Sequence, residues 1–350
     1  MAEARRVSLR KAIEEAVRGD EVPAPILEAA FEEIVAGEAS ETAIAALLVA
    51  LRTKGETVAE IVAAARALRA HADTAEADPR AVDTCGTGGD GADTFNISTA
   101  AAFVVAGAGV PVAKHGNRSA SGRCGSIDVL EGLGVRVDLS TAESARLLAE
   151  VGIAPFFARR AHPAMRRMAP VRAALGIRTL MNCLGPLLNP VGARHQLVGV
   201  YDAALVEPLA EALGRLGAVR AMVVHGEDGL DEITTTTATR VALLAEGRVE
   251  ARTLTPEQAG LGRARPEALQ GGNLQDNVAR IRAILAGERG PARDIVAANA
   301  GAALLVAGAA PDWPSGVARA SQSLDSGAAA ARLDALVEAS QALPVGDATP

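Results

Sequence analysis

The stretch Lys114–Gly122 holds the densest set of side chains able to do chemistry in this chain. Its nine residues, KHGNRSASG, combine two cations, an imidazole, an amide, hydroxyls and glycines directly after an apolar run that ends at Ala113. A lone Lys or His is usually a solvated surface group. A loop that gathers side-chain donors and bare backbone N–H groups is instead suited to an anion. The sequence therefore predicts an anion-binding loop here.

A second loop, Gly86-Thr87-Gly88-Gly89-Asp90, lies upstream, and its glycines allow the backbone to approach a ligand closely. Gly86, Gly88 and Gly91 match the pattern GxGxxG, but a dinucleotide site requires a helix that opens at once, and the next helix starts only after Asp93. The alternatives left are a phosphate loop and a tight turn.

The segment Asn96-Ile97-Ser98-Thr99 begins that helix, with Asn96 as the expected N-cap. A helix N-terminus facing the glycine loop is a place where phosphate binds, and the Ser98 hydroxyl is a candidate metal ligand. The pair Asp231-Glu232 would be solvated in an ordinary turn. Beside a phosphate it would suit Mg²⁺, which takes one or two carboxylates together with phosphate oxygens.

The composition excludes several classes of function. The 350 residues are enough for two domains, and 49% of them are hydrophobic, which indicates a globular chain. Aromatic residues make up only 2% and the net charge is −7, which argues against nucleic acid as a partner. Three cysteines without metal or pairing spacing predict free thiols and a cytoplasmic location. No apolar stretch reaches the roughly 20 residues of a membrane span.

The elements that must position these groups follow from hydrophobic periodicity. Helices alone are expected at 9–17, 26–35, 43–51 and 61–68, the last one starting from the capping box Thr57/Glu60. From Ala81, strands are expected at 81–84, 110–114, 136–139, 154–157, 196–201 and 221–225, then a strand pair at 236–244 and 249–254. Helices are expected at 97–106, 127–132, 140–151, 203–216, 277–286, 295–307 and 328–339. This alternation predicts an α/β fold with a mostly parallel central sheet flanked by helices.

The segment 162–189 is mainly helical in pattern and interrupts the α/β part. We expect it to fold back onto the first helices. The prediction is a small helical domain, 1–73 with 162–190, and a large α/β domain, 74–161 with 191–350, that binds the ligand. Arg172 in this insertion would form a forked pair with a substrate carboxylate if the insertion faces the cleft.

Taken together, these segments resemble the anthranilate phosphoribosyltransferase family, which is related to the pyrimidine nucleoside phosphorylases. The matching motifs keep their order and spacing across nearly the whole chain. They are CGTGGD at 85–90, NIST at 96–99, KHGNRSASG at 114–122, GSIDVLEGLG at 125–134, HPAMRRMAPVRAALGIRT at 162–179, GPLLNP at 185–190 and GLDE at 229–232.

The resemblance implies a cytoplasmic homodimer joined through the helical domain, with phosphoribosyl pyrophosphate (PRPP) as donor, anthranilate as acceptor and Mg²⁺ as cofactor. It implies neither a nucleic-acid nor a membrane partner. The implied donor-binding residues are Gly86, Gly89, Asp90, Thr94, Asn96, Ile97, Ser98, Thr99, Lys114, His115, Gly116, Asn117, Arg118, Ser119, Ala120, Ser121, Gly122 and Ser126. The implied acceptor residues are Gly86, His115, Asn117, His162 and Arg172, and the implied metal ligands are Ser98, Asp231 and Glu232.

The reaction so implied is displacement at the anomeric carbon of the ribose, with release of pyrophosphate. Lys114 would stabilise the departing pyrophosphate, Asn117 would hold the acceptor amine, and Arg172 its carboxylate. The sequence offers no nucleophile–base pair, and an aromatic amine that is uncharged near neutral pH needs no strong base. Two alternatives stay open: a pyrimidine nucleoside phosphorylase, and a non-catalytic relative that binds nucleic acid.

Overall fold

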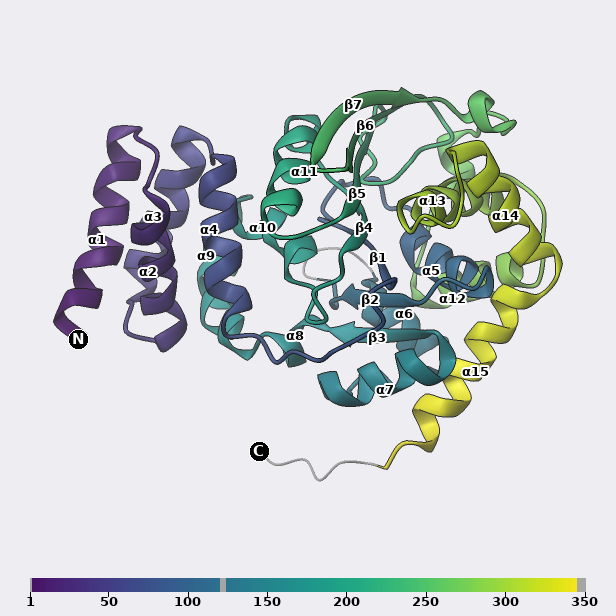
Figure 1. Ribbon diagram of the computed structural model, residues 1–350, viewed down its shortest axis with the longest axis horizontal. Helices are drawn as coiled ribbons and strands as arrows, with labels where there is room; N and C mark the ends of the chain where they lie inside the picture. Colours follow the sequence, from purple (N-terminus) through teal and green to yellow (C-terminus); the bar gives the residue numbers. More distant parts are fainter. Residues whose placement is uncertain (1, 120–123, 345–350) are drawn as a thin grey trace.

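The computed structural model describes residues 2–119 and 124–344. The chain begins with a helical part of four helices (Figure 1): α1 (Ala2–Arg18), α2 (Ala24–Ala36), α3 (Glu41–Lys54) and α4 (Val58–Arg69). The predicted capping box is confirmed, since Glu60 N donates to Thr57 Oγ1 and Thr57 N donates to Glu60 Oε2. The buried Glu60 carboxylate also accepts from Val22 N at 2.8 Å and Lys54 Nζ at 2.6 Å, so it ties α4 to α3 and to the segment before α2.

Within the described residues, seven strands form one sheet in the order β3-β2-β1-β4-β5-β6-β7. The strands are β1 (Val82–Gly86), β2 (Val112–Gly116), β3 (Ile153–Phe157), β4 (His195–Gly199), β5 (Arg220–Gly226), β6 (Thr239–Ala245) and β7 (Arg248–Leu254). The pairs from β3 to β5 are parallel, and β6 and β7 add an antiparallel hairpin. The predicted fold class, a mostly parallel sheet with helices and a helical part, is confirmed.

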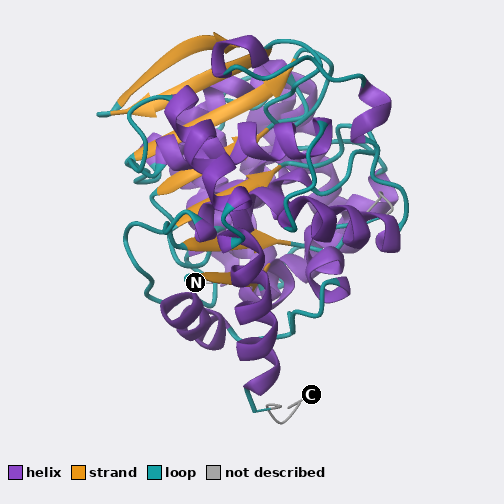
Figure 2. Ribbon diagram, turned by 90° about the vertical axis from the view of Figure 1, so that its right-hand side faces the viewer, coloured by secondary structure: helices purple, strands orange, loops and turns teal. Residues whose placement is uncertain are grey.

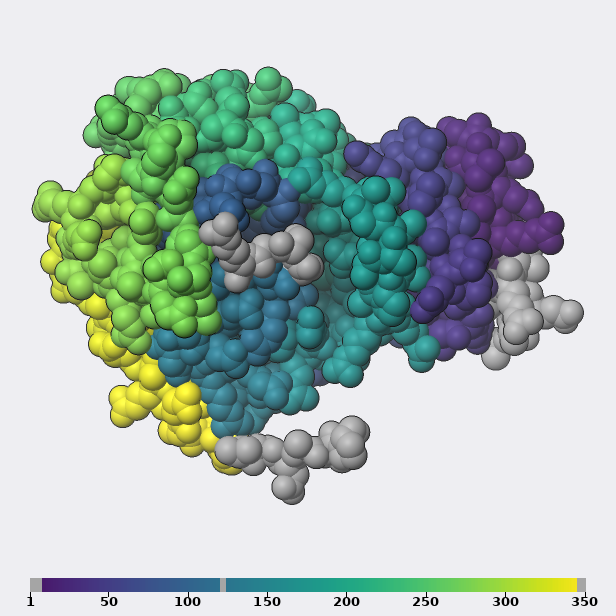
Figure 3. Space-filling view, turned by 180° about the vertical axis from the view of Figure 1, so that it is seen from behind, coloured from purple at the N-terminus to yellow at the C-terminus, as the bar shows by residue number. Residues whose placement is uncertain are grey.

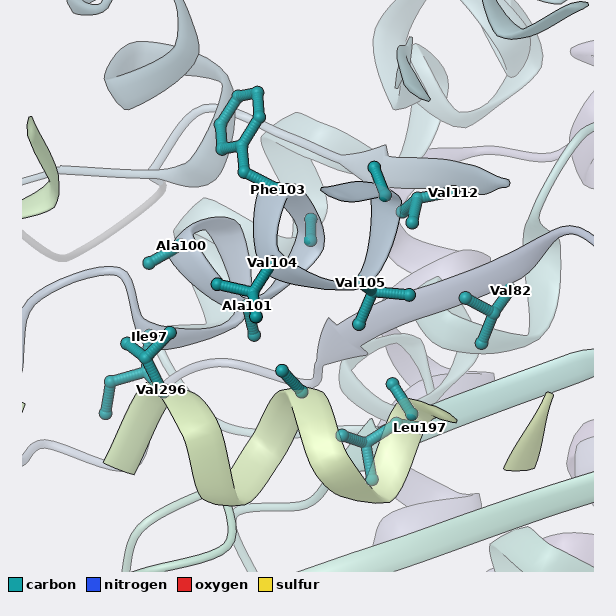
Figure 4. Close-up of a cluster of buried hydrophobic side chains, with 14 of the residues drawn as sticks. Val82, Ile97, Ala100, Ala101, Phe103, Val104, Val105, Val112, Leu197 and Val296 are labelled. Carbon is teal, nitrogen blue, oxygen red and sulfur yellow. The ribbon is translucent and has the colours of Figure 1, made fainter. Parts of the chain in front are cut away.

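Helices cover both faces of this twisted sheet (Figure 2). They are α5 (Ile97–Gly107), α6 (Ser126–Gly132), α7 (Thr141–Val151), α11 (Val206–Arg215), α12 (Leu274–Leu285), α13 (Pro291–Val306), α14 (Trp313–Asp325) and α15 (Ala328–Ala342). Side chains alternate across the sheet, so Leu197 and Met222 join one core while Val198 and Val223 join the other. After its first turn, α5 is almost entirely apolar and buried, and Val296 of α13 lies beside Ile97 at its start (Figure 4).

The insertion between β3 and β4 consists of short helical pieces. They are α8 (Ala158–Ala161), η1 (Pro163–Met168), α9 (Ala169–Leu175), α10 (Met181–Leu184) and η2 (Gly185–Leu188). As expected, η1 contacts α2, α9 contacts α3, and both α10 and η2 contact α4. In the space-filling view, this teal segment lies between the blue helices and the larger α/β part (Figure 3).

One predicted element is wrong, and one helix was not predicted. The segment 136–139 is not a strand: its alternating Val135, Val137 and Leu139 are buried, but Arg136 N donates to Ser340 Oγ of α15 at 3.0 Å. The alternation therefore comes from a coil packed against the last helix. α14 was not predicted, although its buried Trp313, Val317, Ala320 and Leu324 have helical spacing.

Candidate functional site

The predicted site loops all follow the carboxyl ends of parallel strands. The glycine loop follows β1, the Lys114 loop begins within β2, and Asp231 follows β5. The strand order places β1 between β2 and β4, so the chain switches direction across the sheet at β1 and β4. In open α/β sheets, such a switch point creates the crevice in which ligands bind. The fold therefore brings the three distant segments together at the carboxyl end of the parallel strands.

The glycine loop offers backbone donors to a ligand. Gly88, Gly89 and Gly91 have φ of +66°, +75° and +76°, a region that L side chains rarely adopt, so glycine is required at each of them. Within residues 2–119 and 124–344, the N–H groups of Gly89, Asp90 and Gly91 donate to no other group. Consecutive free N–H groups of this kind form an anion site.

Asp231 and Glu232 each bind a backbone N–H of a predicted donor segment. Asp231 Oδ2 accepts from Gly88 N at 2.7 Å, and Glu232 Oε1 accepts from Ser98 N at 3.1 Å. A Cβ on Gly86 would collide with the Asp231 carboxylate, which explains why the strand ends in glycine at this point. The acidic pair is therefore bonded to the glycine loop and to the start of α5, and it is not a separate surface turn.

The negative charges of this pair are only partly balanced by the protein, since the Lys114 charge lowers the pKa of Glu232 without offsetting the opposing effects. Burial, followed by the charge of Asp90, raises the pKa of Asp231 to about 8. Burial and the charge of Asp231 raise the pKa of Glu232 well above its usual range. A nearby cation would relieve this repulsion.

The donor set fits Mg²⁺ better than a metal that needs an all-protein cage. The described residues contain no group of three or more His, Cys, Asp or Glu side chains able to hold a metal ion. Mg²⁺ commonly keeps waters and takes one or two carboxylates with substrate phosphates. Asp231, Glu232 and the Ser98 hydroxyl, which lies at the start of α5, are consistent with that pattern.

The start of α5 differs from prediction in one respect. Asn96 is the N-cap residue, but its side chain makes no capping bond; Asn96 Nδ2 donates to Cys124 O at 3.3 Å and to Asn277 Oδ1 at 3.4 Å. Glu232, 134 residues away, satisfies Ser98 N in its place. Ile97 and Thr99 are buried, and Thr94 forms a β-bridge with Gln270.

Lys114 lies beneath the site. Its ammonium group, on a residue only 2% exposed, donates to Thr84 O at 2.6 Å and to Ser98 Oγ at 3.4 Å. Burial lowers the pKa of Lys114, and the nearby Asp83 opposes that shift. Its positive charge therefore lies beside the first turn of α5, where it contacts the Ser98 hydroxyl.

The loop after β2 is held by backbone and acidic partners. Asn117 O accepts from Ser126 Oγ at 3.4 Å, and Asn117 Oδ1 accepts from Arg118 N at 2.9 Å. Arg118 is paired with Asp128 at 2.8 Å and Glu131 at 2.7 Å, so its charge is already compensated. Gly116 ends β2, and Ser119 N donates to Asp128 Oδ2. Ala120, Ser121 and Gly122 lie outside the described residues.

The two histidines predicted near the acceptor meet each other. The rings of His115, on β2, and His162, in the insertion, pack edge to face with centroids 5.5 Å apart. Burial, then His162, lowers the pKa of His115 to about 3, and burial lowers that of His162. Both rings are therefore neutral. Arg172, on α9, has its pKa lowered by burial alone and pairs with no carboxylate in the described part of the chain.

Sequence reasoning missed four residues that connect these parts. Asp83 is fully buried and accepts from His115 N at 3.1 Å and from Asn189 Nδ2 at 2.9 Å. Arg178 of the insertion donates to Gly89 O and stacks on Tyr201. A charge inside the apolar run Ala81–Thr84 was an available signal for Asp83, because buried charges are rare unless paired. Nothing in the sequence pattern indicates the partners of Arg178.

Known families match both parts of the chain. A family model described as glycosyl transferase family, a/b domain, matches residues 78–330, and one described as its helical bundle domain matches residues 10–72. None of the helices in residues 2–119 and 124–344 has both the length and the apolar character that crossing a bilayer requires.

Individual relatives agree with these models over almost the full length. An anthranilate phosphoribosyltransferase from Rubrobacter xylanophilus is 53% identical over 96% of this chain and 98% of its own. One from Moorella thermoacetica is 54% identical over 94% and 97%.

Solved structures match as well. The crystal structure of the anthranilate phosphoribosyltransferase from Thermus thermophilus has a TM-score of 0.90 and 45% identity, and the match covers 95% of this chain and 99% of that one. The enzyme from Saccharomyces cerevisiae in complex with PRPP and Mg has a TM-score of 0.87 and 25% identity over 96% and 99%. These relatives confirm the resemblance drawn from the motifs and decide between the alternatives that the sequence left open. The chain is therefore an enzyme of the glycosyl transferase type and belongs to the anthranilate phosphoribosyltransferase family.

Proposed function

We propose that this protein transfers the phosphoribosyl group of PRPP to the amine of anthranilate, releases pyrophosphate, and serves tryptophan biosynthesis with Mg²⁺ as cofactor. One observation carries this proposal: the N–H groups of Gly89–Gly91, which donate to no group in the described residues, lie at the carboxyl end of the sheet with the carboxylates of Asp231 and Glu232. The 2.7 Å bond from Gly88 N to Asp231 joins the two sets. A diphosphate that leaves with growing negative charge needs both kinds of group.

The donor would lie on the glycine loop and on the N-terminus of α5. Mg²⁺ bound by Asp231, Glu232 and Ser98 would neutralise charge on the pyrophosphate. Loop N–H groups would donate to phosphate oxygens, and Lys114 would add a fixed positive charge from beneath. The loop Lys114–Gly122 with Ser126 would cover the donor, as the family resemblance implies.

The acceptor would lie between the Lys114 loop and the insertion. Arg172 is suited to a substrate carboxylate because no protein carboxylate in the described residues neutralises it. Asn117, which is exposed, would hold the amine beside Gly86. The neutral rings of His115 and His162 would form an uncharged wall near the aromatic ring. Positioning supplies much of the rate in such a site.

The assembly and the division into domains belong to the same proposal. Residues 1–73 with 162–190 form the small domain, and 74–161 with 191–350 form the large one. Two such chains associate through the helical domain, where the packed helices α1 and α3 expose Val17, 71% accessible, and Val49, 37% accessible. The free thiols of Cys85, Cys124 and Cys183 support a cytoplasmic location.

The fluorescence of anthranilate provides the test. The purified protein should consume anthranilate only when both PRPP and Mg²⁺ are present, with one pyrophosphate released per anthranilate lost. Omitting PRPP or adding excess chelator should stop the loss. Anthranilate fluorescence that stays constant with both present would contradict the proposal.

A further inference from the structure

The tip of the glycine loop has few fixed contacts of its own. Thr87 N donates to Gly199 O at 2.9 Å, and Gly88 N donates to Asp231. Asp90 is anchored by its side chain, which accepts from Ala92 N at 3.2 Å and from Asp231 N at 3.5 Å. Gly89 has no side chain, and glycine peptides rotate with little steric cost. In the described residues, the bond to the carbonyl of the peptide between Gly89 and Asp90 comes from outside the loop.

Arg178 supplies that external contact. Its guanidinium donates to Gly89 O, and it stacks on the Tyr201 ring with 4.1 Å between the guanidinium carbon and the ring centroid. Tyr201 is itself tied to the loop, because Tyr201 N donates to Thr87 Oγ1 at 3.0 Å. The tyrosine ring thus holds the guanidinium plane at a fixed place over the loop.

A trans peptide points its C=O and N–H in opposite directions. Because Arg178 binds the Gly89 carbonyl, the N–H of Asp90 is turned away from the insertion, and it donates to no group in the described residues. We propose that Arg178, braced by Tyr201, is a positioning residue that locks this peptide so that the Asp90 N–H faces the donor phosphates. This inference rests on the proposed function, since it deepens the donor side of the same site.

The insertion contributes a different arginine to each substrate. Arg178 and Arg172 belong to the same insertion, yet Arg178 acts on the donor loop. Loss of the Arg178 side chain should therefore weaken the binding of the donor and not that of the acceptor. Because the Asp90 N–H is one of several loop donors and already binds the donor in the ground state, KM for PRPP should rise more than kcat falls.

The experiment measures initial rates with PRPP varied at saturating anthranilate and Mg²⁺. Arg178→Ala should raise KM for PRPP roughly tenfold, the lower range for losing a hydrogen bond from a charged donor. Arg178→Lys keeps the charge but not the planar stack, so its KM for PRPP should lie between those of wild type and Arg178→Ala. Tyr201→Leu should raise the same constant severalfold. Tyr201→Phe, which keeps the ring, should have a KM for PRPP close to that of wild type. Arg248→Ala, an exposed arginine on β7, is the matched control.

Calorimetric binding of PRPP with Mg²⁺, without anthranilate, gives a second measurement that does not depend on turnover. Arg178→Ala should lose affinity by a similar factor and keep the wild-type melting temperature. A KM for PRPP within twofold of wild type in Arg178→Ala, or a change confined to the anthranilate constant, overturns the assignment of Arg178. A wild-type protein that binds PRPP through Arg178 but consumes no anthranilate overturns the proposed function instead.

Discussion

At Asp231 and Glu232, two carboxylates hold two separate loops while repelling each other. The double variant Asp231→Ala, Glu232→Ala should lose nearly all turnover, because the groups that balance Mg²⁺ are gone. It should stay folded, since the raised pKa of each acid comes first from burial of its carboxylate and then from a nearby negative charge, and the substitution removes both costs. Rates at increasing Mg²⁺ together with thermal melting check both parts.

The control for that variant is Glu288→Ala, because Glu288 is an exposed acid on the turn between α12 and α13. It should keep both activity and Mg²⁺ response. A double variant at Asp231 and Glu232 that turns over at near-normal rates would remove the metal role from this pair.

Arg172 offers a second change at a single residue. Arg172→Ala should raise KM for anthranilate by a factor that corresponds to about 1.5–3 kcal/mol, the loss of a forked charge-assisted pair. KM for PRPP should move much less, which is the reverse of the pattern expected for Arg178→Ala. Steady-state rates with each substrate varied in turn distinguish the two arginines, and an unchanged anthranilate constant would exclude Arg172 from the acceptor site.

The buried His115 and Asp83 predict pH effects of opposite sign. The pKa of His115 is lowered to about 3, so it is uncharged when folded but takes a proton below about 6.5 when unfolded. Its contribution to the free energy of unfolding is therefore lost as pH falls below about 6.5. The pKa of Asp83 is raised to about 6, so its contribution is present at low pH and is lost as pH rises through about 6.

Urea unfolding at pH 7 and pH 4.5 measures both effects. Wild type should lose stability on acidification, and His115→Gln should reduce that loss. Asp83→Asn should increase the loss, because it removes a group whose contribution to the free energy of unfolding rises as pH falls. The slope for one group is at most about 1.4 kcal/mol per pH unit. The same pH dependence in all three proteins would show that neither group titrates as described.

Among the elements, the sequence predicted those whose periodicity reflects burial in the sheet. The strands ending at Gly86, Gly116 and Gly226 were expected within two residues of their observed ends, because an apolar run followed by glycine marks a buried parallel strand. The segment 136–139 has the same alternation but packs on α15, and local pattern cannot distinguish these partners. Asn96 is a similar case: a good capping residue whose cap comes instead from Glu232, far away in the chain.

For the candidate site, the sequence predicted which loops to consider, because glycines, donors and acids carry their chemistry in their residue types. The structure brings these loops together, and the roles of their residues stay predictions. Contacts across the chain, such as Arg178 with Gly89 O or Asn189 with Asp83, depend on how the insertion folds back. They are set by tertiary packing and leave no periodic signal.

Asn189 connects the insertion to the sheet. Its Nδ2 donates to Asp83 Oδ2 and to Ala113 O, each at 2.9 Å, which joins the end of the insertion to β1 and β2. Asn189→Ala would leave a buried carboxylate and a carbonyl without this donor, and should lower the free energy of unfolding by about 1–3 kcal/mol. Urea unfolding checks this, with Asn182→Ala, a half-buried asparagine of the same insertion, as control. Equal stability of the two variants would refute the connecting role.

Over the whole molecule, the helical part is not an isolated bundle. Its core continues through the insertion and α4 into α11 and one face of the sheet, where Val198 and Val223 contribute. Arg69 of α4 strengthens this connection, since it donates to Leu187 O at 2.6 Å and Leu216 O at 3.1 Å. Motion of the proposed small domain would therefore have to carry the insertion, and with it Arg172 and Arg178, relative to the donor loop.

The outer face of the helical part determines the assembly that we propose. Val17 of α1 is 71% accessible, and we propose that it lies, with Val49 of α3, in the contact with a second chain. Val17→Glu should place a charge in that contact and convert the dimer to a monomer in light scattering at micromolar concentration. Val219→Glu, at a 39% accessible valine before β5, should stay dimeric. A wild-type protein with the mass of one chain would refute the dimer, and a dimer that survives Val17→Glu would move the interface away from this end of α1.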